Sequence, residues 1–168
     1  MNPSPFQKSG YNRNTWGKAC LAIRNIHLTW PHRCPGEWRQ FGSHCVIFDE
    51  TPRSWADAEV FHCQSLGGHL SSVHSWLESI FLEALTIDLP LTWIGGMDGG
   101  QPEMTPDGRW SWSDGSKFNY KNWAKGKPEN FDPARRPCIQ MNYGGTKHRW
   151  NDATCGMKFP SLCSLRTE

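Results

Sequence analysis

The sequence predicts a small α+β domain crosslinked by disulfides, with two helices, short antiparallel sheets and a long irregular loop region. Three observations lead to this fold class. Seven cysteines are widely and unevenly spaced, two segments carry helical start and stop signals, and a long stretch rich in Gly, Pro, Asn, Asp and Trp lacks a helical period. The 168 residues include 10 Trp, 16 Gly and 12 Pro, which suits one domain with many turns.

The cysteines indicate the compartment in which the chain works. They lie at positions 20, 34, 45, 63, 138, 155 and 163, and none forms the closely spaced pairs of a zinc site. In a small domain this spacing indicates disulfides and an oxidising environment, so we predict a secreted, extracellular protein. The first residues lack the apolar core of a signal peptide, so we expect any such signal to lie outside this sequence.

Charge and hydropathy exclude two classes of partner. The net charge of +2 is too small to predict nucleic-acid binding. The most apolar stretch, residues 79–96, is interrupted by charged residues and by Pro90, so we predict no membrane span. Residues 1–33 are polar and aperiodic, and we predict a loosely ordered N-terminal extension. It carries the odd Cys20, which suggests a disulfide-linked homodimer or a free thiol, and a cysteine without a role is an equal alternative.

The predicted domain spans residues 34–168, and its elements follow in order. Aromatic and aliphatic residues on both sides of Gly42 predict a hairpin that carries Cys34 and Cys45. After the helices, residues 91–94 predict a buried strand that the glycine pair 95–96 closes. Roughly fifty irregular residues follow, and long stretches of this kind are usually functional loops. We therefore look for the function in that region.

Two helices are predicted from their end signals. Ser54 and Asp57 form a capping box for the first, which ends at the glycine pair 67–68. Ser75 and Glu78 cap the second, which a proline ends. The apolar residues of the second helix follow a helical period and predict one buried stripe, formed by Leu77, Ile80, Phe81, Ala84 and Leu85.

Five short motifs follow one another in the second half of the chain. They are Trp93-Ile94-Gly95, Trp110-Ser111-Trp112-Ser113-Asp114-Gly115, Phe118-Asn119-Tyr120-Lys121-Asn122-Trp123, Lys127-Pro128-Glu129 and Trp150-Asn151-Asp152, with Cys155 and Cys163 after them. Each is weak alone, but the ordered set with its cysteines resembles the C-type lectin-like domain over residues 34–168. Within that family the sequence is similar to the small secreted lectins of fish, a group that includes the type II antifreeze proteins. The resemblance implies a binding domain.

The resemblance also implies a disulfide pattern and one irregularity. The implied bridges, which leave Cys20 outside the domain, are Cys34–Cys45, Cys63–Cys163 and Cys138–Cys155. The family separates the alanine and the cysteine of its first helix by one residue fewer than Ala58 and Cys63 here. Because an extra residue rotates a helix by about 100°, we expect a π-bulge or a shifted register near His62.

The family's lectins hold calcium between the residues that flank a cis proline, a later acid and an Asn-Asp pair, and sugar hydroxyls complete the metal's shell. Carried over, these positions are Lys127, Glu129, a position near Arg136, Asn151 and Asp152. An ammonium and a guanidinium offer only donors and cannot ligate a metal. We therefore expect no cofactor and calcium-independent binding, with Glu129, Asn151 and Asp152 as weak metal ligands if calcium binds at all.

Two interpretations of this site remain. In the first, which we favour, the Lys127 ammonium occupies the calcium position and donates to sugar hydroxyls. In the second, the site has decayed, the Asn-Asp pair caps a turn, and the domain binds protein, glycan or ice by another face. A carboxylate after the proline is the order of galactose-type sites, and Phe131 or Tyr143 offers an aromatic face for stacking. The resemblance thus favours a galactoside such as lactose.

Charge suggests a second kind of glycan. Residues 125–149 carry six basic residues against two acidic ones. Such a loop attracts anionic glycans or microbial surface polymers, as an innate-defence protein would, and a merely solvated basic loop is an equal alternative. We expect no enzyme, because no motif places a hydroxyl nucleophile and the nearby cysteines are oxidised. His62, His69 and His74 lack zinc spacing and are interpreted as scattered surface residues. A type II antifreeze-like ice-binding protein is the remaining alternative.

Overall fold

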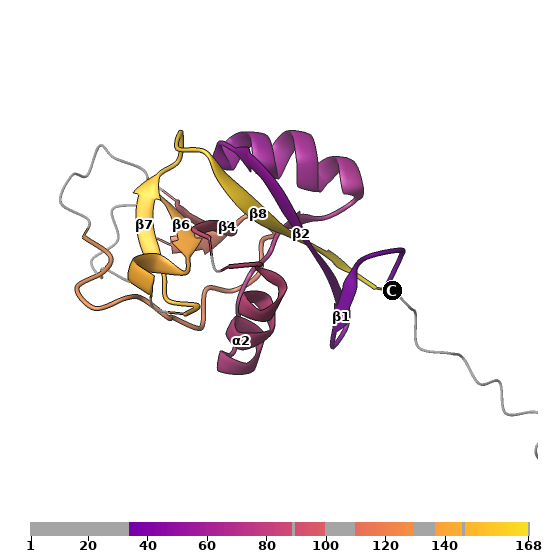
Figure 1. Cartoon of the computed structure of the whole chain (residues 1–168), viewed down its shortest axis with the longest axis horizontal. Coiled ribbons are helices and arrows are strands. Elements are labelled where there is room, and N and C mark those ends of the chain that lie inside the picture. The colour runs from indigo at the N-terminus through magenta and orange to yellow at the C-terminus, as the bar shows by residue number, and fades with distance from the viewer. Residues whose placement is uncertain (1–33, 89, 100–109, 130–136, 146, 168) are drawn as a thin grey trace, which may run out of the picture. The chain divides into compact units, whose positions relative to one another are not determined.

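The computed structural model describes residues 34–88, 90–99, 110–129, 137–145 and 147–167. In these residues one eight-stranded sheet has the order β1-β2-β8-β4-β6-β7, while β3 pairs with β8 and β5 with β4 (Figure 1). The strands are β1 Arg39–Phe41, β2 His44–Arg53, β3 His69–Leu70, β4 Thr92–Asp98, β5 Trp110–Trp112, β6 Pro137–Met141, β7 Asn151–Thr154 and β8 Phe159–Arg166. Pairings are antiparallel except between β4 and β8. The expected short antiparallel sheets are thus joined into one mixed sheet.

The first helix begins after Ser54, whose hydroxyl accepts the backbone N–H of Asp57 at 3.2 Å and donates to its carboxylate at 2.7 Å. A π-helical segment, η2 (Asp57–Cys63), is followed by a 3-10 turn, η3 (Gln64–Leu66). The helix ends at Gly67, whose φ of 82° is readily adopted only by glycine. The start and the end predicted from the sequence are therefore confirmed.

The extra residue of this helix is absorbed by the π-helical turn. Hydrogen bonds of a π-helix join residues five apart, so Ala58 and Cys63 face the same side. Both are fully buried, and the cysteine reaches Cys163 of β8. An α-helix would have turned the cysteine away from the sheet. The irregularity expected near His62 is confirmed.

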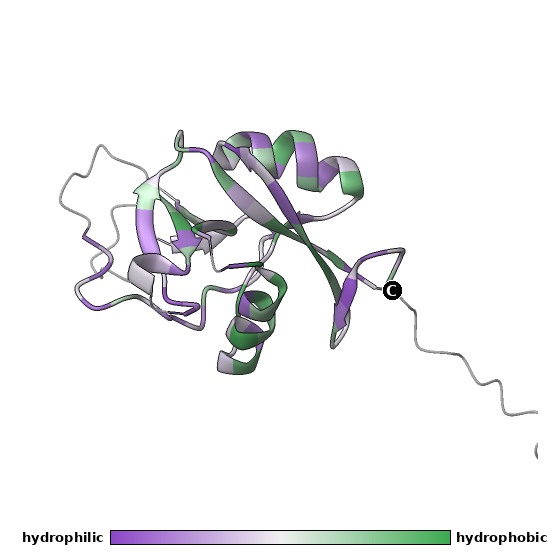
Figure 2. Cartoon of the chain, in the orientation of Figure 1, coloured by the Kyte–Doolittle hydropathy of each residue, from purple (hydrophilic) through white to green (hydrophobic). Residues whose placement is uncertain are grey.

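The second helix, α2, spans Trp76–Leu85 and is capped by the Ser75 hydroxyl, which accepts the N–H three residues later at 3.1 Å. The predicted apolar stripe is wrong in part. Leu77 is 64% exposed and Ala84 is exposed, whereas Leu82 is buried in the core. Apolar residues lie on more than one face of this helix, as Figure 2 shows, so periodicity alone did not identify the packed face.

Two glycines expected to close β4 lie inside it. A Cβ on Gly95 would approach the carbonyl oxygen of Leu70 to 2.5 Å, and one on Gly96 would overlap the side chain of Ile139. These positions need glycine because neighbouring chain packs directly against them. The strand therefore continues to Asp98, beyond its predicted end.

Three disulfides connect these elements. They are Cys34–Cys45, Cys63–Cys163 and Cys138–Cys155. This confirms the pairing that the resemblance implied, and Cys20 lies outside the described residues. One buried cluster includes Leu82, Ile139 and Trp150, and a second includes Trp93 and both cysteines of the longest bridge. No helix in the described part of the chain is both long and apolar enough to cross a membrane.

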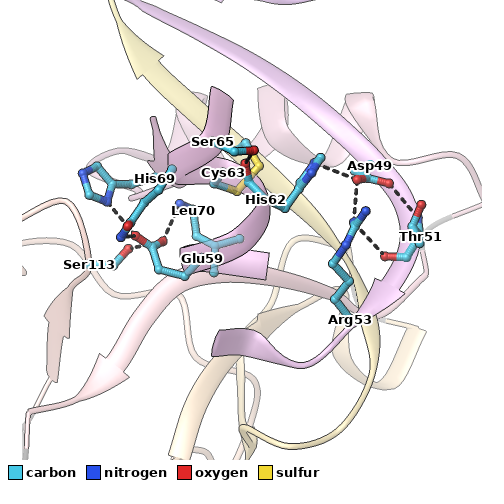
Figure 3. The surroundings of a disulfide bond; sticks show 12 residues. Asp49, Thr51, Arg53, Glu59, His62, Cys63, Ser65, His69, Leu70 and Ser113 are labelled. Atoms are coloured by element: carbon cyan, nitrogen blue, oxygen red, sulfur yellow. Dashed lines mark hydrogen bonds and ion pairs between the residues drawn. A yellow bond between two sulfur atoms is a disulfide. The ribbon is translucent and has the colours of Figure 1, made fainter. Parts of the chain in front are cut away.

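Two histidines interpreted as scattered surface residues contact carboxylates (Figure 3). His62 Nε2 lies 2.7 Å from Asp49 Oδ2, and His69 Nδ1 lies 2.6 Å from Glu59 Oε1. Glu59 is only 4% exposed. The sequence did not predict these two carboxylate partners, because they lie on other elements and the sequence does not show which strands come together.

Candidate functional site

A buried tryptophan, Trp150, holds two segments of the candidate site side by side. Trp150 forms a β-bridge with Trp123, its N–H donates to the carbonyl of Asn122 at 2.9 Å, and its carbonyl accepts the N–H of Ala124 at 2.8 Å. The segment before the Lys-Pro-Glu tripeptide therefore runs alongside the start of β7. Because hydrogen bonds fix both segments, residues 127–129 lie beside the Asn-Asp pair of that strand.

Asn122 is a positioning residue that the sequence analysis missed. Its side chain is 3% exposed, its Nδ2 donates to the carbonyl of His148 at 2.8 Å, and its Oδ1 accepts from Arg149 Nη1 at 2.8 Å. It thus connects the two segments that flank the site. A polar residue directly before the aromatic Trp123 was the one available signal, and it did not distinguish a buried asparagine from a solvated one.

Three of the predicted site residues form one connected group. The Lys127–Pro128 bond is cis, as the resemblance implied. Lys127 Nζ donates to Glu129 Oε1 at 2.5 Å, and the backbone N–H of Glu129 donates to Asp152 Oδ1 at 3.0 Å. The Lys127 side chain is 10% exposed and that of Glu129 43% exposed. The cation is therefore sheltered while the carboxylate partner faces solvent.

The ammonium is stabilised in its charged form. Its nitrogen lies 4.9 Å from the ring centre of Tyr143, a residue of the short 3-10 turn η4 (Tyr143–Gly145). Burial lowers the pKa of Lys127, but the hydrogen bond to Glu129 and the interactions with Tyr143, Glu129 and Asp152 outweigh it, so the pKa lies above its ordinary 10.5. A cation held in this way has no lone pair to offer a metal.

Asn151 contributes a buried acceptor. The residue is 8% exposed, and among the described residues its Oδ1 has no hydrogen-bond partner. No hydrogen bond in the described part of the chain joins it to Lys127, so the cation contacts Glu129 and not all three retained oxygen ligands. The predicted residues Arg136 and Phe131 lie outside the described residues.

This donor set does not fit a calcium ion. Calcium takes 6–8 oxygen ligands, and here an ammonium occupies one ligand position and is hydrogen-bonded to the carboxylate of another. In the described residues no group of three or more His, Cys, Asp or Glu side chains is arranged to hold a metal ion. The arrangement instead offers hydrogen-bond donors and acceptors to a polar, uncharged ligand.

The fold and the order of motifs define a class of protein. The Lectin C-type domain family matches residues 51–165, and the chain belongs to this family. Its members are binding domains, so the chain is not an enzyme.

Two of its relatives are lectins. Ladderlectin of Oncorhynchus mykiss is 48% identical over 134 residues, which cover 77% of this chain and 66% of ladderlectin. The galactose-specific lectin nattectin of Thalassophryne nattereri is 41% identical over 135 residues, 78% of this chain and 79% of nattectin.

Type II antifreeze proteins are also similar to this chain. A type-2 ice-structuring protein of Hemitripterus americanus is 35% identical over 135 residues, covering 80% of this chain and 76% of that protein. The structure of herring type II antifreeze protein superposes with a TM-score of 0.70 at 34% identity, over 80% of this chain and 100% of that one. The expected resemblance to small fish lectins and type II antifreeze proteins is confirmed.

Proposed function

We propose that this domain is a carbohydrate-binding lectin that works without calcium, with Lys127, Glu129, Asn151 and Asp152 as its site. The observation that carries the proposal is the sheltered Lys127 ammonium, which is hydrogen-bonded to Glu129 at 2.5 Å. It supplies positive charge and directed donors at the position where the family's lectins hold the metal. A sugar is a suitable ligand because its hydroxyl groups both donate and accept hydrogen bonds.

The chemistry of recognition follows from the groups left available. An ammonium has three donors, and its one hydrogen bond given among the described residues goes to Glu129, so in this proposal the remaining donors bind sugar hydroxyls. The exposed Glu129 carboxylate accepts hydrogen bonds in return.

Within this proposal the preferred ligand is a galactoside such as lactose. The carboxylate follows the proline, and a relative at 41% identity is described as galactose-specific. Tyr143 presents one ring face to Lys127. We therefore propose Phe131 as the stacking residue, or else the other face of Tyr143.

We further propose secretion, with residues 1–33 as an N-terminal extension, and disulfide-linked homodimers through Cys20. As a separate proposal, the basic residues of the 125–149 segment, Arg136 included, contact anionic or microbial glycans during innate defence. Two linked sites raise avidity without any new contact. Replacing Cys20 by Ser should abolish the dimer on a non-reducing gel, and a dimer that persisted would refute this assignment.

The first test removes the cation. Lys127→Ala should weaken lactose binding more than about tenfold, because the variant loses a charged donor at the centre of the site. Lys125→Ala, which removes an exposed positive charge two residues away, is the matched control and should bind normally. Calorimetry gives the affinities, and thermal unfolding shows that both variants fold. Equal lactose affinity in the two variants would mean that the site has decayed.

The second test removes calcium. EDTA should leave lactose affinity unchanged, since in this proposal the Lys127 ammonium takes the role of the metal. A sugar-binding titration with and without EDTA measures this directly. Loss of binding in EDTA would show that a metal is required and that Lys127 does not take its place.

Ice binding is the second candidate, supported by the similarity to type II antifreeze proteins at 34–35% identity. Thermal hysteresis of the purified protein decides between the two candidates. The lectin proposal predicts no hysteresis together with lactose binding, and hysteresis without lactose binding would favour the ice-binding alternative.

A further inference from the structure

A hollow of about 610 Å³ lies over the strands β2, β8 and β3. It shares no residue with the Lys127 site. The polar side chains that line it include His44, His69, His74, Asp114, Ser164 and Arg166. The volume is within the range of about 300–1,000 Å³ that is usual for small-molecule sites.

The strand register explains why four of these side chains share the floor of the hollow. Arg166 of β8 lies opposite His44 of β2, and Ser164 of β8 lies opposite His69 of β3. Residues two apart on a strand face the same side of the sheet, as do residues directly opposite each other on paired strands. The two histidines, the serine and the arginine therefore project together.

The floor presents donors that are not used elsewhere. His69 Nδ1 donates to Glu59 at 2.6 Å (Figure 3), so its Nε2 faces a ligand as an acceptor in the neutral ring and as a donor once the ring is protonated, and its side chain is 42% exposed. Among the described residues, no hydrogen bond or ion pair engages the side chains of His44, Ser164 or Arg166. An arginine with free donors favours an anionic group, and the two imidazoles add to this when they are protonated.

The wall of the hollow is a closed hydrogen-bond network. Both nitrogens of His74 are engaged, Nδ1 with Asn119 Oδ1 at 3.0 Å and Nε2 with the hydroxyls of Ser72 and Ser116 at 3.1 Å. Asp114 accepts from the same two serines at 2.5 and 2.6 Å. Burial raises the pKa of Asp114, but these bonds and the nearby His74 outweigh it and the pKa lies below its ordinary value. This carboxylate is therefore charged and already supplied with donors.

A metal ion does not suit the hollow. His74 has no free nitrogen and His69 has one, and the described residues contain no metal-binding group of three. The other acidic neighbours are also occupied. Glu59 contacts His69, and Glu78 accepts the backbone N–H of His74 at 2.7 Å. The available groups are the donors of the floor.

We propose that this hollow binds a sugar residue carrying a sulfate or phosphate ester, with the oxyanion held by His44, His69 and Arg166, and that binding strengthens as the pH falls. Imidazole is the side chain whose charge ordinarily changes between pH 5 and 8. Protonation adds a positive charge and makes both ring nitrogens donors, so an anion gains attraction on acidification. The neutral face of the sugar fills the rest of the volume.

Calorimetry with glucose 6-sulfate on the full chain tests this proposal. The sulfate ester keeps one negative charge throughout, so its affinity should rise about fivefold between about pH 7.5 and about pH 5.5. Glucose 6-phosphate loses charge near pH 6 and should gain less, which distinguishes the two esters. Glucose itself should bind more weakly than the sulfate ester, and its affinity should be the same at both pH values. Equal affinity of the sulfate at both pH values, or equal binding of glucose, would overturn the proposal.

Variants identify the groups responsible. Arg166→Ala should weaken glucose 6-sulfate binding at both pH values, and His44→Gln should reduce the pH dependence while keeping a donor. Lys158→Ala, an exposed positive charge outside the hollow, is the control and should bind like the parent. Lys127→Ala should also leave this binding intact, so the two sites can fail separately. Unchanged affinity in Arg166→Ala, or tight binding of zinc in place of the sulfate, would refute the site.

Discussion

At the scale of single residues, Glu59 connects several segments of the chain, and no motif of the sequence predicted these contacts. Its carboxylate accepts from Gln64 Nε2 at 3.1 Å, Leu70 N at 2.8 Å and the Ser113 hydroxyl at 2.9 Å, and it contacts His69 at 2.6 Å (Figure 3). These partners belong to η3, β3 and the segment after β5. A buried carboxylate is tolerated because every side of it meets a donor.

We predict that Glu59→Gln lowers the free energy of unfolding by about 2 kcal/mol, because it removes the charge from four hydrogen bonds and replaces one acceptor oxygen by a donor that faces other donors. Denaturant unfolding of the variant and the parent measures the difference. Glu50→Gln on the exposed surface of β2 is the control and should change stability little. A Glu59 variant as stable as this control would show that the network does not contribute to the free energy of unfolding.

At the scale of elements, the π-helical turn accommodates a residue that an α-helix would not. Ala58 and Cys63 are both fully buried although they are five positions apart. Phe61 between them is 75% exposed. The insertion therefore bulges toward solvent, and the buried face of the helix keeps its contacts with the sheet.

Deletion of Phe61 should convert the turn to α-helix and leave the free energy of unfolding within about 1 kcal/mol of the parent, since Ala58 and Cys63 then lie four apart on one face. Thermal unfolding and peptide mapping of the Cys63–Cys163 bridge measure the outcome. Deletion of Ala84 in α2 is the contrasting control. It rotates the end of a regular helix by about 100° and should cost more than about 2 kcal/mol. Equal losses in the two variants would refute this account of the bulge.

At the scale of the whole molecule, the three disulfides close loops of very different length. Cys63–Cys163 joins residues 100 apart, whereas Cys34–Cys45 and Cys138–Cys155 span 11 and 17 positions. The long bridge ties the first helix to β8, a strand that pairs with β2, β3 and β4. In the chain-entropy view a longer closed loop restricts the unfolded chain more.

Paired Cys→Ala substitutions should therefore differ in cost. Removing Cys63 and Cys163 should lower stability by about 4–5 kcal/mol, and removing either short bridge by about 3 kcal/mol. Thermal unfolding of the three double variants gives the ranking. A greater loss for Cys34 and Cys45 than for the long bridge would show that local strain in the native state, and not loop closure, sets the order.

The sequence allowed both helices and their caps to be predicted, because these depend on neighbouring residues. The π-helical irregularity was expected from the resemblance, because the family has one residue fewer between Ala58 and Cys63. The resemblance supplied the disulfide pairing and the Lys127 tripeptide. The sequence pattern could not identify the packed face of α2, since Leu77 and Leu82 are equally apolar and only packing against the sheet decides between them. Nor did it predict that Asn122 would be buried as a connector.

By itself, the sequence determined local structure, namely short-range capping and the order of the motifs. The resemblance identified the candidate site and the replacement of an oxygen ligand by Lys127. Only the tertiary structure decided which distant groups meet. His44, His69 and Arg166 lie on three strands, and their shared face follows from strand register, which a one-residue shift would reverse. The partners of Glu59 likewise depend on how β3 and the chain after β5 pack against the first helix. Contacts between residues far apart in the chain arise from pairing and packing, and the order of amino acids does not display them directly.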